Sequence, residues 1–384
     1  MQGRTHPCVR PEEFLVFSPG SAKLSGELSG ELSGGTMPHY SRDVKIGQLV
    51  MVGFRGRSLS EDRHIRNIIR NHHLGSVVLF DDVSPFGPPV RGNVESPEQL
   101  KALTREIQNT ADIPLFIALD HEGGSVNRLK ERYGFPPVCP ASEFGDRNDE
   151  TFTREESERR AKLLKELGVN VNLAPVVDVN VNPQNPALGL RKRCISHDPE
   201  IVTRHARIML EIFHDYGIYS TLKHFPGHGS STNDSHFGLV DVTDGWCESE
   251  LHPFKTLISE GFSDFILTAH AYNRKLDSDF PGTLSRKILT DLLRNELGFK
   301  GVIISDDMNM AAIHDHYDQA EAVEIALNAG VDILAIANAN HYDPEIALRI
   351  MDMIREGIRK GRIQESVIDR SFERIIRLKQ HLRL

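Results

Sequence analysis

The sequence has few cysteines, no long apolar run and no block of basic residues. Its four cysteines, out of 384 residues, are widely separated and form no Cys-x-x-Cys pair. This argues against a disulfide framework or a zinc-thiolate site and favours a reducing compartment, so we expect a cytoplasmic protein. No apolar run reaches the roughly 18 residues that a membrane span needs, and Phe14–Phe17 is too short for the apolar core of a signal peptide.

Charge and composition restrict the partners and the class of protein. The formal net charge is -9, which argues against nucleic acid or an anionic membrane surface as the main partner. With 39% hydrophobic and 26% charged residues, the chain has the profile of a globular protein with an ample core. We expect it to act as a monomer.

The first 40 residues differ from the rest of the chain. They are rich in Gly, Ser and Pro and contain a short repeat, Ser25–Gly34. Such a segment buries too little apolar surface to offset its chain entropy, so we predict a disordered arm over residues 1–40. Residues 41–384 are then predicted to form one domain, because barrels of alternating strands and helices commonly have this length.

Eight short apolar runs recur along the remaining chain, and most are continuous in hydrophobicity, as strands buried on both faces should be. Segments of helical length with charged faces separate them. The runs are Gly47–Phe54, Ser76–Phe80, Ile113–Asp120, Val169–Asp178, Tyr219–Phe225, Phe265–His270, Gly301–Asp307 and Asp332–Ala337.

Helix-start and helix-end signals between the runs support alternating helices and strands. Ser96-Pro97 and Asp198-Pro199 are typical helix starts, and Asp343-Pro344 repeats this signal. Glycines that could end helices in a left-handed cap precede many runs; they are Gly75, Gly168, Gly217, Gly261, Gly298 and Gly330. Eight such units predict an α/β fold, a single-domain (β/α)₈ TIM barrel, closed by a helix over Gln364–Lys379. A doubly wound open sheet is the alternative, but neither a GxGxxG nor a Walker loop favours it.

The stretch from Thr221 to His236 carries many titratable side chains. It follows an apolar run, breaks at Pro226-Gly227, and carries a lysine, three histidines and an aspartate within sixteen residues. A barrel places its active site at the carboxyl ends of its strands. Other polar residues also end runs there, among them Asp120, Asp178, His270 and Asp306.

Three chemistries could use this set of residues. A metal hydrolase could use His224, His228, Asp234 and His236, although Pro226 and Gly227 keep the first two histidines off one helix face. A non-catalytic sugar- or peptide-binding barrel would need the pocket but not the titrating groups. Glycoside hydrolysis needs groups that attack and protonate across a sugar-sized gap, with hydroxyl-binding groups around them. The residues alone leave these three open.

Two long motifs resemble glycoside hydrolase family 3, and most closely its β-N-acetylhexosaminidase branch. They are Lys223-His-Phe-Pro-Gly-His-Gly229, followed by Asp234-Ser-His236, and Gly301-Val-Ile-Ile-Ser-Asp-Asp-Met308. The resemblance runs from about Ile46 to the final helix. It implies a (β/α)₈ barrel, a retaining mechanism, no cofactor and no metal.

The resemblance also implies roles for individual residues. Asp306 would be the nucleophile, with Asp307 a structural neighbour, and His236 paired with Asp234 would be the acid/base. A loop imidazole near neutral pKa suits this role because it can donate a proton and later accept one. Sugar binding would fall on Asp120, Arg128, Arg193, Lys223 and His224.

One turn departs from the family pattern. The usual Gly-x-Arg turn is replaced by Leu188-Gly-Leu-Arg-Lys-Arg193, so that either Arg191 or Arg193 could reach the substrate, and we favour Arg193. Glu122, beside two glycines, is expected to tie its loop to the backbone. Residues 227–232 are expected to form a hinge that swings the acid/base over bound substrate.

Together with the polar strand ends, the resemblance implies a retaining exo-β-N-acetylhexosaminidase that removes terminal N-acetylglucosamine from peptidoglycan fragments or chitooligosaccharides. The alternatives are a β-glucosidase-type or phosphorolytic member of the same family, and a sugar-binding barrel without catalysis. A histidine acid/base that is neutral after the first step would tolerate an incoming phosphate better than a carboxylate would.

Overall fold

A computed structural model describes residues 40–82, 90–235, 238–339 and 342–382. The arm predicted over residues 1–40 lies outside these ranges except for Tyr40. Residues from Pro38 to Leu384 form one compact unit. No helix in the described ranges is both long enough and apolar enough to cross a bilayer.

Eight parallel strands form a nearly closed barrel. Their order in the sheet is β11-β9-β7-β6-β3-β2-β1-β12, and an isolated parallel bridge between Ile304 and Ile333 joins the two ends. Each strand lies within one of the eight predicted runs, which confirms the (β/α)₈ fold. The strands are β1 (Val50–Gly53), β2 (Ser76–Val78), β3 (Phe116–Leu119), β6 (Val171–Asn172), β7 (Tyr219–Phe225), β9 (Phe265–Thr268), β11 (Val302–Ile304) and β12 (Leu334–Ile336).

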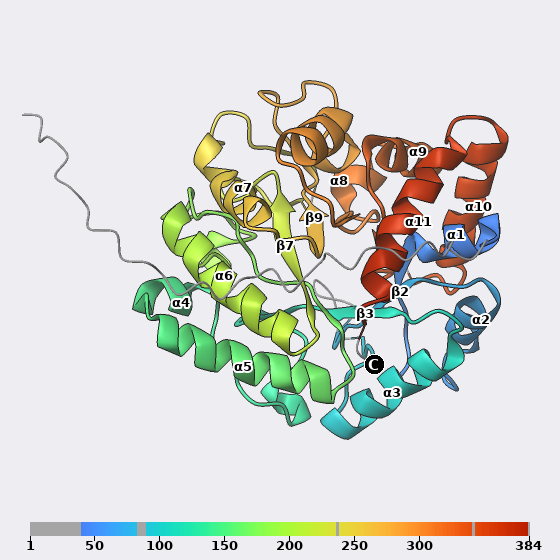
Figure 1. The fold of residues 1–384 in the computed structure, drawn as a ribbon, viewed down its shortest axis with the longest axis horizontal. Coiled ribbons are helices and arrows are strands. Elements are labelled where there is room, and N and C mark those ends of the chain that lie inside the picture. The colour runs from blue at the N-terminus through green and yellow to red at the C-terminus, as the bar shows by residue number, and fades with distance from the viewer. Residues whose placement is uncertain (1–39, 83–89, 236–237, 340–341, 383–384) are drawn as a thin grey trace, which may run out of the picture. The chain divides into compact units, whose positions relative to one another are not determined.

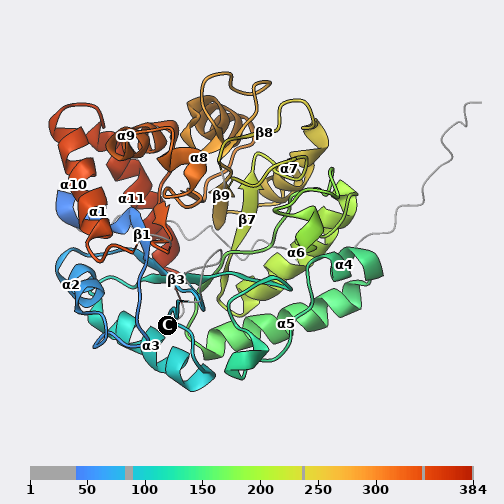
Figure 2. The same cartoon turned by 180° about the vertical axis from the view of Figure 1, so that it is seen from behind.

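Helices surround the strands and follow the chain order around the barrel (Figures 1 and 2). They are α1 (Arg42–Gln48), α2 (Arg63–Asn71), α3 (Pro97–Thr110), α4 (Ser142–Arg147), α5 (Glu150–Glu166), α6 (Pro199–Asp215), α7 (His252–Ser259), the π-helix η6 (Lys287–Glu296), α8 (Ala311–His314), α9 (Gln319–Ala329), α10 (Ile346–Arg359) and α11 (Glu365–Lys379). Short elements lie in the loops: β4 (His121–Gly123), β5 (Val126–Asn127), β8 (Val240–Asp241), β10 (Ala271–Tyr272), and the 3₁₀ turns η1 (Glu131–Tyr133), η2 (Gly189–Arg191), η4 (Glu248–Glu250) and η5 (Gly282–Leu284).

The predicted helix signals mostly act as expected. Ser96 and Asp198 cap α3 and α6 through their side chains, with proline as the first helical residue. Five of the six glycines have positive φ, but Gly75 does not, and His73 is the left-handed residue there instead. Gly75 is required for another reason: a Cβ would lie 2.5 Å from the carbonyl oxygen of Gln48.

Aromatic rings fill the amino-terminal end of the barrel. The rings of Phe116, Tyr219 and Phe265 meet edge to face, with centroids 5.0 to 6.0 Å apart. The predicted closing helix, α11, packs against this end. The Nζ of its last residue, Lys379, donates to the carbonyl oxygen of Gly75 at 2.7 Å and lies 4.9 Å from the Phe116 ring centroid. This end of the barrel is therefore packed, and the polar strand ends lie at the other.

Candidate active site

The strand ends bring together a cluster of carboxylates and cations, which we call the sugar-site cluster: Asp120, Glu122, Arg128, Arg193 and Lys223. Asp120 follows β3, and Lys223 lies on β7. The Nζ of Lys223 contacts Asp120 Oδ1 at 2.9 Å and Glu122 Oε1 at 2.5 Å. Arg128, which follows β5, donates to Asp120 Oδ2 at 2.7 Å. Three sequence-predicted sugar-binding residues thus form one connected network.

Arg193 joins the same cluster through Glu122. Its Nε and Nη2 each donate to a Glu122 carboxylate oxygen at 2.8 Å, and its side chain is 11% exposed. Arg191, the other arginine of the unusual turn, is exposed, and its Nη2 lies 3.8 Å from Asp234 Oδ2. Both arginines therefore lie near predicted site residues, but only Arg193 contacts the sugar-site cluster.

Electrostatics keeps the sugar-site cluster ionised. Burial alone would raise the pKa of Asp120, but Lys223 and Arg128 outweigh burial and hold that pKa well below its ordinary value. Burial likewise opposes ionisation of Glu122, and Arg193 and Lys223 lower its pKa. Burial would lower the pKa of Lys223, but the two carboxylates raise it. Fixed charges of both signs suit hydrogen bonding to sugar hydroxyls, which both donate and accept.

His224 is oriented by Asp178. Asp178 Oδ2 accepts hydrogen bonds from the main-chain N–H of His224 at 3.0 Å and from its Nδ1 at 2.6 Å. Asp178 Oδ1 accepts from the main-chain N–H of His228 at 2.8 Å. Burial opposes the charge on Asp178, but its histidine partners lower its pKa. Asp178, which ends the fourth of the eight apolar runs, is thus a positioning group for His224 and His228.

Asp306 follows β11 at the same end of the barrel. Its main-chain N–H donates to Thr268 Oγ1 on β9 at 3.3 Å, and its Oδ1 accepts from the main-chain N–H of Asp307 at 2.8 Å. Asp307 Oδ1 accepts main-chain N–H groups of Asn309 and Ala337. The structural role expected for Asp307 is confirmed by these contacts.

Of the predicted acid/base pair, only Asp234 belongs to the described residues. It is 8% exposed, on the loop that follows β7. His236 lies outside the described residues, so its role remains a prediction. In the described ranges, no group of three or more His, Cys, Asp or Glu is arranged to hold a metal ion.

Two expectations from the sequence need revision. The Glu122 carboxylate binds Lys223 and Arg193 instead of the backbone of its own loop. The proposed hinge is anchored over most of its length, because residues 227–231 are buried. At its centre, a Cβ on Gly229 would lie 1.7 Å from the Val179 carbonyl oxygen. Only Thr232 of that segment is exposed.

The sequence alone does not reveal the buried carboxylate of Glu250. It lies at the end of η4, and its Oε2 accepts the main-chain N–H groups of Gly229 at 2.8 Å and Ser230 at 3.3 Å. No local pattern marks this residue, since Glu248 two positions earlier has the same side chain and is exposed. Burial of Glu250 becomes visible only in the folded chain.

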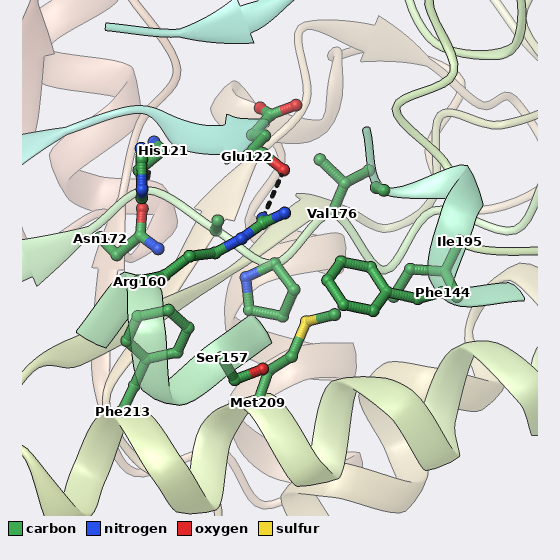
Figure 3. Close-up of a pocket in the computed structure, with 13 residues that line it drawn as sticks. His121, Glu122, Phe144, Ser157, Arg160, Asn172, Val176, Ile195, Met209 and Phe213 are labelled. Carbon is green, nitrogen blue, oxygen red and sulfur yellow. Dashed lines mark hydrogen bonds between the residues drawn. The ribbon is translucent and has the colours of Figure 1, made fainter. Parts of the chain in front are cut away.

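A small cavity lies behind the sugar-site cluster, between β4 and helices α5 and α6 (Figure 3). Its volume is about 20 Å³, which is room for roughly one water molecule and too little for a sugar. Arg160 crosses it and donates to the main-chain oxygens of Glu122 at 2.9 Å and Cys139 at 2.8 Å. This cavity therefore belongs to the support of β4 and not to substrate binding.

Comparisons with known proteins agree with the fold and the motifs. The chain is 32% identical to "Beta-hexosaminidase A" of Pseudoalteromonas piscicida, over 88% of this chain and 60% of that protein. It is also 32% identical to a "Beta-hexosaminidase" of Nitrosomonas eutropha, over 80% of this chain and 84% of the relative. The chain thus spans less than two thirds of the first relative's length.

Solved structures give the same picture. A glycoside hydrolase family 3 β-N-acetylglucosaminidase from Paenibacillus sp. superposes with a TM-score of 0.79 at 33% identity, covering 89% of this chain and 63% of that one. A β-N-acetylhexosaminidase from Beutenbergia cavernae gives a TM-score of 0.78 at 26% identity, covering 89% and 99%. The family model described as "Glycosyl hydrolase family 3 N terminal domain" matches residues 41–378. With nearly the whole barrel matched, the chain belongs to glycosyl hydrolase family 3.

Proposed function

We propose that this protein is a retaining exo-β-N-acetylhexosaminidase that releases terminal N-acetylglucosamine from peptidoglycan fragments or chitooligosaccharides. The observation that carries the proposal is the sugar-site cluster at the carboxyl ends of the barrel strands, in a chain whose relatives are named for hexosaminidase activity. Charged groups already paired with one another can exchange those contacts for sugar hydroxyls without reorganising the barrel.

In the proposed reaction, the Asp306 carboxylate attacks the anomeric carbon of the bound sugar. The bond to the leaving oxygen breaks, and that oxygen takes a proton from His236. A water molecule then gives a proton back to His236 and attacks the same carbon, which releases Asp306 and restores the starting configuration. Asp234 supports the charged form of the imidazole. Because the acid is a histidine, the usual separation between two carboxyl groups does not apply.

Sugar binding is assigned to Asp120, Arg128, Arg193, Lys223 and His224. Asp120 would accept hydrogen bonds from two hydroxyls, and the cations would donate to hydroxyl oxygens. The proposal includes no cofactor, no metal and no partner besides the carbohydrate.

Nitrophenyl glycosides test the proposal directly. We expect the wild type to release nitrophenol from the N-acetylglucosaminide and not from the glucoside, with the β-anomer as first product. His236→Ala should lose at least about 10²-fold in kcat, the lower range for a positioned proton-transfer group. Asp306→Ala removes the nucleophile and should lose at least as much. No release from either sugar would refute catalysis, and undiminished activity of Asp306→Ala would remove the nucleophile assignment. Formation of a sugar phosphate in phosphate buffer would show phosphorolysis instead of hydrolysis.

A further inference from the structure

Glu250 has no part in the proposed chemistry, yet its side chain lies directly beneath the loop that follows β7. It is 0% exposed, and its Oε2 binds two successive main-chain N–H groups of that loop, those of Gly229 and Ser230. We infer that Glu250 is a positioning residue: it fixes the described part of the loop after β7, residues 226–235, which we call the β7 loop, and through it holds Asp234, the proposed partner of the acid/base, in place for proton transfer to the leaving group. The inference rests on the proposed function.

Three consecutive main-chain N–H groups at the start of the loop are bound by two buried carboxylates. Asp178 Oδ1 accepts from His228 at 2.8 Å, and Glu250 Oε2 accepts from the next two residues. Asp178 also orients His224, so it serves the sugar site as well. Within the described residues, the two side-chain hydrogen bonds of Glu250 both go to the loop, so its loss should affect the loop more than the sugar site.

The anchorage continues toward the proposed acid/base residue. The carbonyl oxygen of Ser231 accepts from Asn182 Nδ2 at 2.8 Å, and Ser231 Oγ donates to the carbonyl oxygen of Asn233 at 2.6 Å. Asn233 immediately precedes Asp234, which is itself buried. A connected series of hydrogen bonds and peptide units thus joins Glu250 to Asp234.

Close packing restricts the backbone conformation of the anchored segment. A Cβ on Gly227 would lie 2.6 Å from Glu250 Cβ, and one on Gly229 would lie 1.7 Å from the Val179 carbonyl oxygen. Trp246 Nε1 also donates to the carbonyl oxygen of Pro226 at 3.1 Å. The β7 loop is therefore packed against both the segment 246–250 and residue 179.

The charge state of Glu250 should change the strength of this anchor. Burial raises the pKa of Glu250 to about 7; the neighbouring Asp178 carboxylate acts in the same direction, and the hydrogen bonds from Gly229 and Ser230 act against it. Two titratable groups of the same region carry no charge near neutral pH, because burial lowers the pKa of His228 to about 4 and raises that of the Cys194 thiol. An ionised carboxylate binds N–H groups more strongly than a neutral one. The anchor should weaken as Glu250 gains a proton.

The dependence of kcat/KM on the leaving group distinguishes a residue that positions the acid from one that only stabilises the fold. In Glu250→Gln, kcat/KM for a methylumbelliferyl N-acetylglucosaminide should fall about tenfold or more, a part of the 10² to 10⁴ that a positioned acid supplies. The dinitrophenyl glycoside, whose leaving group needs no proton, should change less than about twofold. The matched control is Glu248→Gln, which removes an exposed carboxylate from the same turn and should change neither substrate.

The pH profile gives a second readout. For the methylumbelliferyl substrate, wild-type kcat/KM should fall as pH drops through about 7, where Glu250 gains its proton. In Glu250→Gln this limb should be absent, and only the lower limb of the nucleophile should remain. Affinity for free N-acetylglucosamine should stay unchanged and shows that the variant is folded. If Glu250→Gln does not fold, Glu250→Asp, which keeps the charge on a shorter side chain, should show the same leaving-group dependence.

An equal loss on both glycosides, or no loss on either, would overturn the inference, as would an acidic limb near pH 7 that persists in Glu250→Gln. Failure of the proposed function looks different. There the wild type would cleave neither glycoside, or Asp306→Ala would stay active, whatever the behaviour of the Glu250 variants.

Discussion

Replacing Glu122 by glutamine should destabilise the protein and weaken sugar binding together. The Glu122 side chain is 2% exposed and accepts two hydrogen bonds from Arg193 at 2.8 Å, with Lys223 Nζ 2.5 Å away. Glutamine keeps one acceptor oxygen but turns an NH₂ group toward the remaining donors. Removing one partner of a buried ion pair costs about 3–5 kcal/mol. Because the shape and one acceptor remain, we expect the free energy of unfolding to decrease by about 3 kcal/mol.

The assay is urea denaturation at pH 7, with titration of N-acetylglucosamine as a second measurement. The matched control is Glu143→Gln, since Glu143 pairs with Arg147 on an exposed helix surface with side chains 38% and 55% exposed. Such a pair contributes less than about 1 kcal/mol. A loss in Glu122→Gln no greater than in the control would refute the reasoning. So would unchanged sugar affinity, because Arg193 and Lys223 would then be oriented by other contacts.

Three further predictions concern stability and metal. Burial holds the pKa of Lys379 well below its usual range, so below about pH 10 the unfolded chain binds a proton that the folded chain does not. The free energy of unfolding should rise between pH 7 and 10 and rise less in Lys379→Met, as denaturation at several pH values would show. Gly229→Ala should lower the melting temperature and abolish activity, because its Cβ would overlap the Val179 carbonyl oxygen; an unaltered melting curve would contradict this. Dialysis against a chelator should leave activity on the nitrophenyl N-acetylglucosaminide unchanged, and a loss restored by added zinc would contradict the expected absence of a metal.

The local parts of this protein could be predicted from the sequence. Strand positions follow from continuous apolar runs, and the starts of α3 and α6 follow from a capping side chain before a proline. These signals depend only on residues close in the sequence, so they can be recognised without knowledge of the fold. The prediction for Gly75 failed for the opposite reason. Its requirement comes from a close approach to the main chain of Gln48, the last residue of helix α1, which no local pattern reveals.

The same division applies to the site. The sequence by itself determined the barrel and placed Asp120, Lys223 and Asp306 at strand ends that meet at one face, because parallel strands align their carboxyl ends. Only the tertiary structure decided how the charges pair. Glu122 and Arg193 are 71 residues apart, and Glu250 lies 21 residues from the Gly229 N–H group that it binds. A carboxylate becomes an anchor or a partner through burial and through the donors that the closed barrel brings to it, and both depend on the whole fold.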